Sequence, residues 1–167
     1  PDEPGVRTPG FWQNPNNGGQ FWDGIIGNED HAGEPGFPEG ELLYTVDSDC
    51  DDDLDPGTLG LLIGDFDQDG LTGMNEDTLF ISLADAQALV GSGGGSDGVE
   101  KLGRDVVATW LNFLAGNDID NPGTGDDLVN PQHFIDDAID WLQVYGDASP
   151  SNINNPLEDC DVYSPDH

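Results

Sequence analysis

Apolar residues recur with a helical period in the second half of the chain, and they predict two long helices. The first runs from a cap at Asp97 to Ala115. The second begins after Asn130, with Pro131 at the first helical position, and ends at Tyr145. The apolar stripe of the first is Val99, Leu102, Val106, Trp110 and Phe113, and that of the second is Ile135, Ala138, Ile139, Leu142 and Tyr145.

The pattern before residue 91 is shorter and less regular. Residues 41–46 are predicted to form a short helix or strand, and residues 58–63 a short apolar turn. A further helix is predicted from Glu76 or Asp77 to Val90. Its apolar stripe is Leu79, Leu83, Ala86 and Val90. Helices therefore dominate, and we predict a mostly α fold, a single irregular helical domain with long coil segments rich in Gly, Pro and Asn.

One domain is predicted over residues 1–167, because no linker separates two cores. Residues 1–40 form an irregular N-terminal segment, in which aromatic rings are set among Gly, Pro and Asn. Residues 41–146 form the helical core, and residues 147–167 form a C-terminal tail without periodicity. The core carries the most specific motif of the chain.

Residues 65–76, DFDQDGLTGMNE, fit the calcium-loop pattern D-x-D-x-D-G-x5-E, with Gly70 at the sharp turn. Calcium takes about six to eight oxygen ligands. The predicted ligands are the side chains of Asp65, Asp67, Asp69 and Glu76 and the carbonyl of Leu71. No second complete loop is present, so a structural Ca²⁺ that holds two flanking helices at a set angle is favoured over a sensor. An Asp/Gly turn without metal is the alternative.

A second acidic run surrounds Cys50. Its alternation of Asp47, Asp49 and Asp51 resembles the start of a calcium loop, but glycine is missing from the sixth position. Both a further calcium site and a solvated acidic surface stay open for this run. A third, weaker candidate consists of Asn117, Asp118, Asp120, Asp126 and Asp127.

The chain has 35 acidic residues and a formal net charge of -32. Its basic residues are Arg7, Lys101 and Arg104. Such a charge destabilises the compact state at low ionic strength, and salt screens it, so we expect a salt-adapted source. Nucleic acid is excluded as a partner because no basic patch can neutralise phosphates. Membrane insertion is excluded because no apolar run approaches roughly 20 residues.

Export of the protein is expected from the first residue of the sequence and from its two cysteines. The sequence opens on Pro1 instead of Met, which indicates a cleaved precursor, with a trimmed chain as the alternative. Cys50 and Cys160 are the only cysteines, and in an exported chain they predict one disulfide, with two free thiols as the alternative. An extracellular or cell-surface location follows.

The sequence does not decide whether the protein is an enzyme, and we favour a protein without enzymatic activity. The sequence has no H-E-x-x-H and no Gly-rich phosphate loop followed by Lys. The run GSGGGSDG at 91–98 is interpreted as a flexible connection. His133 lies near Asp136 and Asp137 on a predicted helix, and a surface or interface histidine is the simpler interpretation.

Residues 7–15, RTPGFWQNP, resemble the TPGYWKNHP-type opening of a family of exported bacterial and archaeal domains. Residues 41–43, ELL, and 102–112, LGRDVVATWLN, resemble later segments of that family, and the similarity extends to about residue 145. The family occurs on surface and secreted proteins, so the resemblance implies a location more than an activity. The loop at 65–76 is also similar to dockerin-type calcium modules, although this chain has one copy and ends it with Glu.

Two functions follow from these features. The first is an exported calcium-binding structural protein, a self-assembling homo-oligomeric subunit of a cell-surface filament, layer or extracellular matrix of a halophile. The alternative is a secreted carbohydrate-binding module or hydrolase with a structural calcium. Its candidate stacking rings are Phe11, Trp12, Phe21 and Trp22, for which core packing is the other interpretation. An open aromatic cleft in the monomer would favour the alternative.

Overall fold

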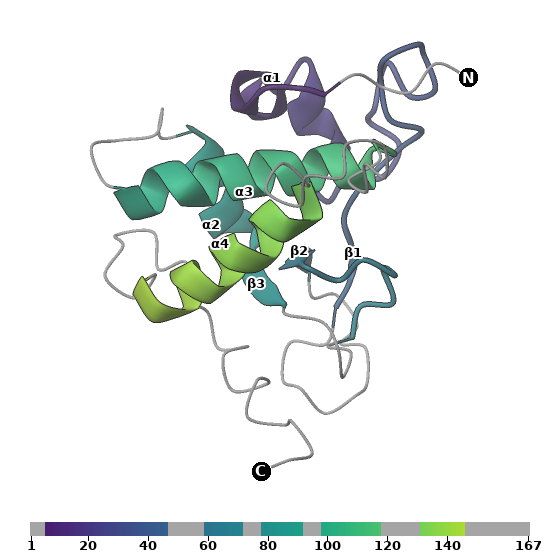
Figure 1. Cartoon of the computed structure of the whole chain (residues 1–167). Helices are drawn as coiled ribbons and strands as arrows, with labels where there is room; N and C mark the ends of the chain where they lie inside the picture. The colour runs from purple at the N-terminus through teal and green to yellow at the C-terminus, as the bar shows by residue number, and fades with distance from the viewer. Residues whose placement is uncertain (1–5, 47–58, 72–77, 92–97, 118–130, 146–167) are drawn as a thin grey trace, which may run out of the picture.

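The computed structural model describes residues 6–46, 59–71, 78–91, 98–117 and 131–145 (Figure 1). Its elements in chain order are α1 Pro9–Gln13, the 3-10 helix η1 Gly18–Phe21, β1 Tyr44–Thr45, β2 Leu59–Ile63, β3 Leu79–Ser82, α2 Leu83–Gly91, α3 Gly98–Leu114 and α4 Pro131–Tyr145. Helices make up 46% of the described residues, and a three-stranded antiparallel sheet accompanies them. The prediction of a mostly α fold is therefore wrong, and the architecture is mixed.

The sheet has the order β1–β2–β3, with β2 antiparallel to both neighbours. Alternate residues of β2 face opposite sides. Leu61 and Ile63 join the main core, whereas Leu62 packs with Phe80 in a second cluster. Because both faces of β2 are buried, its sequence is a continuous apolar run, which periodicity cannot assign to a strand. The prediction of an apolar turn over residues 58–63 is wrong for this reason.

The helix after the acidic loop begins later than predicted. Strand β3 occupies Leu79–Ser82, so α2 covers only Leu83–Gly91 and the predicted start at residue 76 or 77 is wrong. Ser82 marks the change from strand to helix. Its Oγ accepts a hydrogen bond from the Asp85 N–H at 3.3 Å and donates one to Asp85 Oδ2 at 2.9 Å. This is the arrangement of a helix N-cap, in which a short hydroxyl side chain satisfies a free N–H of the first turn.

The two long helices predicted from periodicity are confirmed as α3 and α4. In Figure 1, α3 crosses the centre of the molecule, where it contacts α1, α2, α4 and β2. The buried members of its predicted stripe are Val99, Val106 and Trp110, and α4 buries Ile135, Ala138, Ile139 and Leu142. None of the described helices is long and apolar enough to cross a membrane.

The N-terminal segment contains two short helices, α1 and η1, where none was predicted, and β1 is the strand alternative for residues 41–46. The Arg7 N–H donates to Asn112 Oδ1 at 2.8 Å, and Asn112 Nδ2 donates to the Arg7 carbonyl at 2.9 Å. The Arg7 guanidinium lies 4.8 Å from the centre of the Phe11 ring and donates to the Gly36 carbonyl at 2.6 Å. The side chain of Asn112 on α3 therefore links the start of the N-terminal segment to the helices.

Replacing Asn112 by alanine should destabilise the protein by about 2 kcal/mol, because two hydrogen bonds with the Arg7 backbone are lost and each contributes roughly 1 kcal/mol. Urea unfolding in high salt measures the change. The matched control is Asn16→Ala, because Asn16 is exposed and its side chain makes no hydrogen bond with a described residue. Equal midpoints for the two variants would show that Asn112 does not hold the segment.

Candidate metal centre

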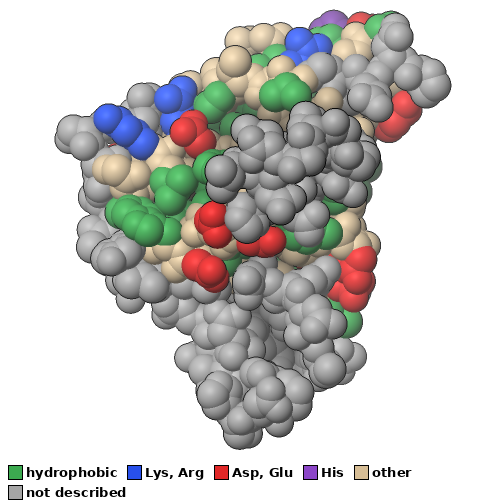
Figure 2. Space-filling model, in the orientation of Figure 1, with side chains coloured by type: hydrophobic (Ala, Val, Ile, Leu, Met, Phe, Trp, Pro, Cys, Tyr) green, Lys and Arg blue, Asp and Glu red, His purple; other side chains and the backbone are tan. Residues whose placement is uncertain are grey.

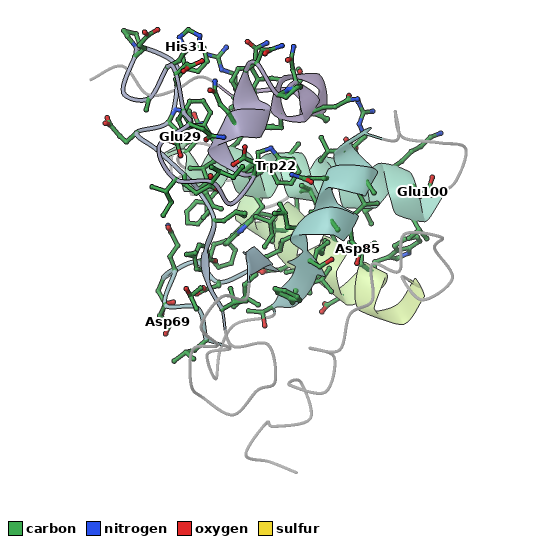
Figure 3. The ribbon with its side chains drawn as sticks, turned by 180° about the vertical axis from the view of Figure 1, so that it is seen from behind. Trp22, Glu29, His31, Asp69, Asp85 and Glu100 are labelled. Carbon is green, nitrogen blue, oxygen red and sulfur yellow. The ribbon has the colours of Figure 1, made fainter. Side chains whose placement is uncertain are left out.

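The acidic loop lies between two strands of the sheet. Strand β2 ends at Ile63 and β3 begins at Leu79, and these two residues pair with each other. The prediction that two helices flank the loop is therefore wrong, because the chain leaves one strand and returns along its antiparallel neighbour. Figure 3 shows Asp69 at the outer edge of the molecule, away from the helices.

Three carboxylates of the loop converge. One oxygen from each of Asp65, Asp67 and Asp69 lies within 4.8 Å of the others. The N–H groups of Asp69 and Gly70 donate to the two Asp65 oxygens, at 3.3 and 2.9 Å. Gln68 and Gly70 have positive φ angles of 55° and 78°, which curl the backbone around the cluster. The loop thus brings together the three aspartates that the sequence pattern selects.

Asp65 is the buried member of the cluster, whereas Asp67 and Asp69 are exposed. The pKa of Asp65 is raised from 3.8 to about 7, first by burial and then by the hydrogen bond with Asp67 and the charge of Asp69. The Gly70 N–H and the Tyr44 hydroxyl act in the opposite direction, because both hydrogen bond with the Asp65 carboxylate. The effect of burial therefore outweighs the hydrogen bonds that favour the ionised form of Asp65.

The Asp65, Asp67 and Asp69 cluster could hold a metal ion. All of the ligand atoms that it offers are carboxylate oxygens. Hard divalent cations prefer such oxygens, and a cation placed among them would favour the ionised form of Asp65. Cation binding is therefore the chemistry that this arrangement supports.

Two further predicted residues are described, and they have different surroundings. The Leu71 N–H donates to Asp69 Oδ1 at 2.8 Å, which fixes the peptide beside the cluster. Asn117 is buried and its Nδ2 donates to the Asn112 carbonyl at 3.0 Å, so it caps the end of α3. The remaining candidates lie outside the described residues: Glu76, Asp47, Asp49, Asp51, Cys50, Cys160, Asp118, Asp120, Asp126 and Asp127.

Sequence reasoning missed Tyr44. The pairing of Tyr44 with Gly60 places β1 beside β2. The Tyr44 hydroxyl lies 3.4 Å from the Leu62 carbonyl oxygen, to which it can donate, and its interaction with the Asp65 carboxylate lowers the pKa of that group. This contact depends on the register of two strands that are distant in sequence, so no local pattern around Tyr44 could have identified it.

Calcium affinity should fall as the pH is lowered below 7. Without metal, the pKa of Asp65 is about 7 against an ordinary 3.8, so the folded protein holds a proton on this group that the unfolded chain has released. Binding of that proton stabilises the folded state at low pH, and this stabilisation decreases as the pH rises from about 4 to 7. Below pH 7 a bound cation must displace that proton, so affinity should approach a tenfold loss for each pH unit.

Calorimetric titration of calcium at about pH 6 and pH 8, in buffers of different ionisation enthalpy, tests this pH dependence. We expect weaker binding and release of a proton at the lower pH. The same affinity at both pH values, with no proton released, would contradict the assignment of Asp65 as a ligand.

The aromatic rings considered for stacking on sugars are mostly buried. Trp12, Phe21 and Trp22 expose 1%, 0% and 2% of their surface. Phe11 is half-buried and packs edge-on against Trp12, with ring centroids 5.0 Å apart. These rings therefore belong to the core of the N-terminal segment, and they present no flat platform for a sugar.

Comparison with known proteins assigns this chain to no family. The resemblances to the TPGYWKNHP-type and dockerin-type families stay predictions from the segments at residues 7–15 and 65–76. No protein-family model, no curated protein and no solved structure matches the chain.

Proposed function

We propose that this protein is an exported calcium-binding structural protein, with a structural Ca²⁺ in the loop at residues 65–76. The observation that carries the proposal is the convergence of Asp65, Asp67 and Asp69. The sequence adds Glu76 and the Leu71 carbonyl as further ligands. Two oxygens from Glu76 would bring this set to the range of about six to eight that calcium takes.

Calcium suits this ligand set better than magnesium or zinc. Magnesium demands an almost ideal octahedral shell and keeps several of its waters. Zinc prefers nitrogen and sulfur ligands, and the described cluster contains neither histidine nor cysteine. A loop that offers many carboxylate oxygens in a flexible arrangement favours the larger, hard cation.

In this proposal, calcium closes the connection between β2 and β3. Asp65 follows shortly after Ile63, which pairs with Leu79 at the end of the ladder. An ion bound by the loop neutralises the repulsion among its carboxylates and keeps the ends of the two strands together. The ion therefore stabilises the sheet, in place of the angle between helices that the sequence predicted.

Self-assembly on a cell surface is the second part of the proposal. On the face in Figure 2, acidic side chains gather over α4, while basic ones lie over α3 and the N-terminal segment. The net charge of -32 repels copies at low salt, and high salt in the surroundings of a halophile screens it. Val6, Ile25 and Ile26 are 81%, 58% and 88% exposed, and neighbouring copies would remove these apolar side chains from water.

Light scattering in high salt, with calcium and then with a chelator, tests the assembly. We expect large particles that dissolve when calcium is removed. Replacing Ile26 by aspartate should reduce the particle size with little effect on the melting temperature, because Ile26 is 88% exposed. A monomer under every condition would refute self-assembly and leave only the calcium site.

A further inference from the structure

The outer sides of α3 and α4 form a surface that carries exposed aromatic rings and charges of both signs. We call it the α3/α4 surface, and its residues are Lys101, Arg104, Phe134, Asp137, Asp140 and Trp141. Phe134 and Trp141 are 38% and 39% exposed. They are seven residues apart, so they lie on the same side of α4, about 10.5 Å apart along its axis. Aromatic side chains are enriched at protein–protein contacts, so this side of α4 is a candidate interface.

Lys101 and Arg104 supply the positive charge of the surface. They are three residues apart on α3, so they lie on one side of that helix. Neither forms an ion pair with a described residue. Arg7, the remaining basic residue of the chain, is held in the N-terminal segment by the Gly36 carbonyl and the Phe11 ring. The two cations of α3 can therefore pair with carboxylates of another molecule.

Asp137 and Asp140 supply the negative charge of the surface. Both are exposed on α4, which contacts α3. Figure 2 shows acidic side chains over α4 on the same face of the molecule as the basic side chains over α3. One face thus carries cations on one helix and carboxylates on its neighbour, together with exposed rings.

Such a surface is complementary to itself. In a dimer with a two-fold axis, the same surface of both copies meets, so each contact between two residues occurs twice. The α3 cations of each copy then face the α4 carboxylates of the other, and the α4 rings leave water. A partner of uniform charge would match only half of the surface. A second copy of this chain is therefore the partner that fits best.

The net charge of -32 on each copy opposes this contact at low salt. At about 1 M salt the Debye length is about 3 Å. A direct ion pair has about this separation, whereas most charges of the two copies are much further apart. High salt therefore removes most of the repulsion between the copies and keeps a larger share of the attraction between paired groups.

We infer that this protein forms a two-fold symmetric dimer through the α3/α4 surface. Phe134 and Trp141 form its apolar part, and the α3 cations of each copy pair with the α4 carboxylates of the other. The inference rests on the self-assembly proposed above, in which this dimer is the unit that the exposed Ile26 joins to further copies. The α3/α4 surface does not include the acidic loop, so the dimer forms without calcium.

Sedimentation equilibrium of the full chain carrying Ile26→Asp, in about 2 M NaCl with chelator, tests the dimer apart from larger particles. We expect a monomer–dimer equilibrium. The variants Lys101→Glu, Arg104→Glu and Asp137→Lys, Asp140→Lys should each weaken the dimer at least about tenfold, because like charges then meet. Combining the two sets should return the dissociation constant to within about threefold of its original value.

The Asp137→Lys, Asp140→Lys variant distinguishes specific pairing from general repulsion. It makes the net charge less negative, so general repulsion alone predicts a tighter dimer, whereas specific pairing predicts a weaker one. The matched control is Asp30→Lys, Glu39→Lys, which makes the same change of charge at two exposed acids of the N-terminal segment. This control should not weaken the dimer.

Tryptophan fluorescence gives a second measurement. Trp12, Trp22 and Trp110 expose 1%, 2% and 0% of their surface, so acrylamide quenching reports mainly on Trp141. Quenching should decrease as the concentration rises from about 1 µM to about 100 µM and dimers form. Trp141→Ala should weaken the dimer about tenfold, as for a central aromatic residue of an interface. Its melting temperature at low concentration shows whether the monomer still folds.

Three results would overturn the inference: a monomer at every concentration, a tighter dimer in the Asp137→Lys, Asp140→Lys variant, or a dimer in which the quenching of Trp141 is unchanged. Large particles of the wild-type chain in calcium would still support self-assembly in each of these cases. Conversely, a dimer with the expected response to charge reversal, but no larger particles in calcium, would support the dimer and refute the proposed filament or layer.

Discussion

Replacing Asp65 by asparagine is expected to abolish the stabilisation that calcium gives the protein. A cation at about 100 times its dissociation constant adds about 2.7 kcal/mol to the free energy of unfolding. For a chain of this size that corresponds to a rise in melting temperature of roughly 5–11 °C. Asp65 is the buried carboxylate of the cluster and both of its oxygens are held by backbone N–H groups, so its loss should remove most of this rise.

The same variant should behave differently in chelator. Because the pKa of Asp65 is raised to about 7 without metal, its ionisation above that pH costs stability in the empty site. Asparagine removes this cost, but its one acceptor oxygen can replace only one of the two carboxylate oxygens that accept backbone N–H groups. At about pH 8 the metal-free variant should therefore melt close to the metal-free wild type. Scanning calorimetry in high salt, with about 10 mM calcium or with chelator, compares the two proteins.

Asp105→Asn is the matched control for this prediction. Asp105 is exposed on α3 and lies outside the cluster, so the same change of charge should leave the calcium-dependent rise intact. A rise of equal size in the Asp65→Asn and Asp105→Asn variants would show that calcium acts through the general charge of the chain. In that case the proposed metal centre would have no role in stability.

The part of the fold that the sequence could predict is the part governed by local rules. Helices α3 and α4 have an apolar stripe on one side, and a Pro at the start of α4 marks its first residue. The loop around Asp65 follows a pattern in which each position has a local task, such as the turn at Gly70. Neither feature depends on contacts with residues that are distant in sequence.

The sheet could not be predicted, because its signals come from distant parts of the chain. Leu61 and Leu62 are adjacent and both fully buried, since the helical core covers one face of β2 and a second cluster covers the other. This removes the alternation that identifies a half-buried strand. The stripe of apolar residues from Leu79 onward also fits a helix, and only pairing with β2 makes Leu79–Ser82 a strand.

In the candidate site, too, some features follow from the local sequence and others depend on distant parts of the chain. The convergence of Asp65, Asp67 and Asp69 follows from neighbouring residues of one loop. The contact of Tyr44 with Asp65 follows from strand register, and the burial of Asp65 follows from the packing of the sheet. The pattern therefore predicted which three carboxylates lie together, whereas the raised pKa of Asp65 could be inferred only from the structure.

Replacing Gly60 by alanine is expected to destabilise the protein strongly, and the direction of the change distinguishes the strand from a helix. A Cβ at Gly60 would lie 2.6 Å from the Phe80 ring and 2.7 Å from the Ile81 carbonyl oxygen on the neighbouring strand. Removing this overlap requires movement of both the Phe80 ring and the backbone of β3. We therefore expect the free energy of unfolding to fall by about 3 kcal/mol, the upper end of the range for overpacked cores. The melting temperature should fall by roughly 6–12 °C.

A helical or turn conformation around Gly60 predicts a different result. In a helix, alanine is more favourable than glycine by about 0.5–1 kcal/mol, so the variant would be more stable than wild type. Gly98→Ala is the control, because a Cβ at this first residue of α3 meets no described atom within 4 Å. Urea unfolding of both variants in high salt should show a large loss for Gly60→Ala and little change for Gly98→Ala, and a gain for Gly60→Ala would refute the pairing of β2 with β3.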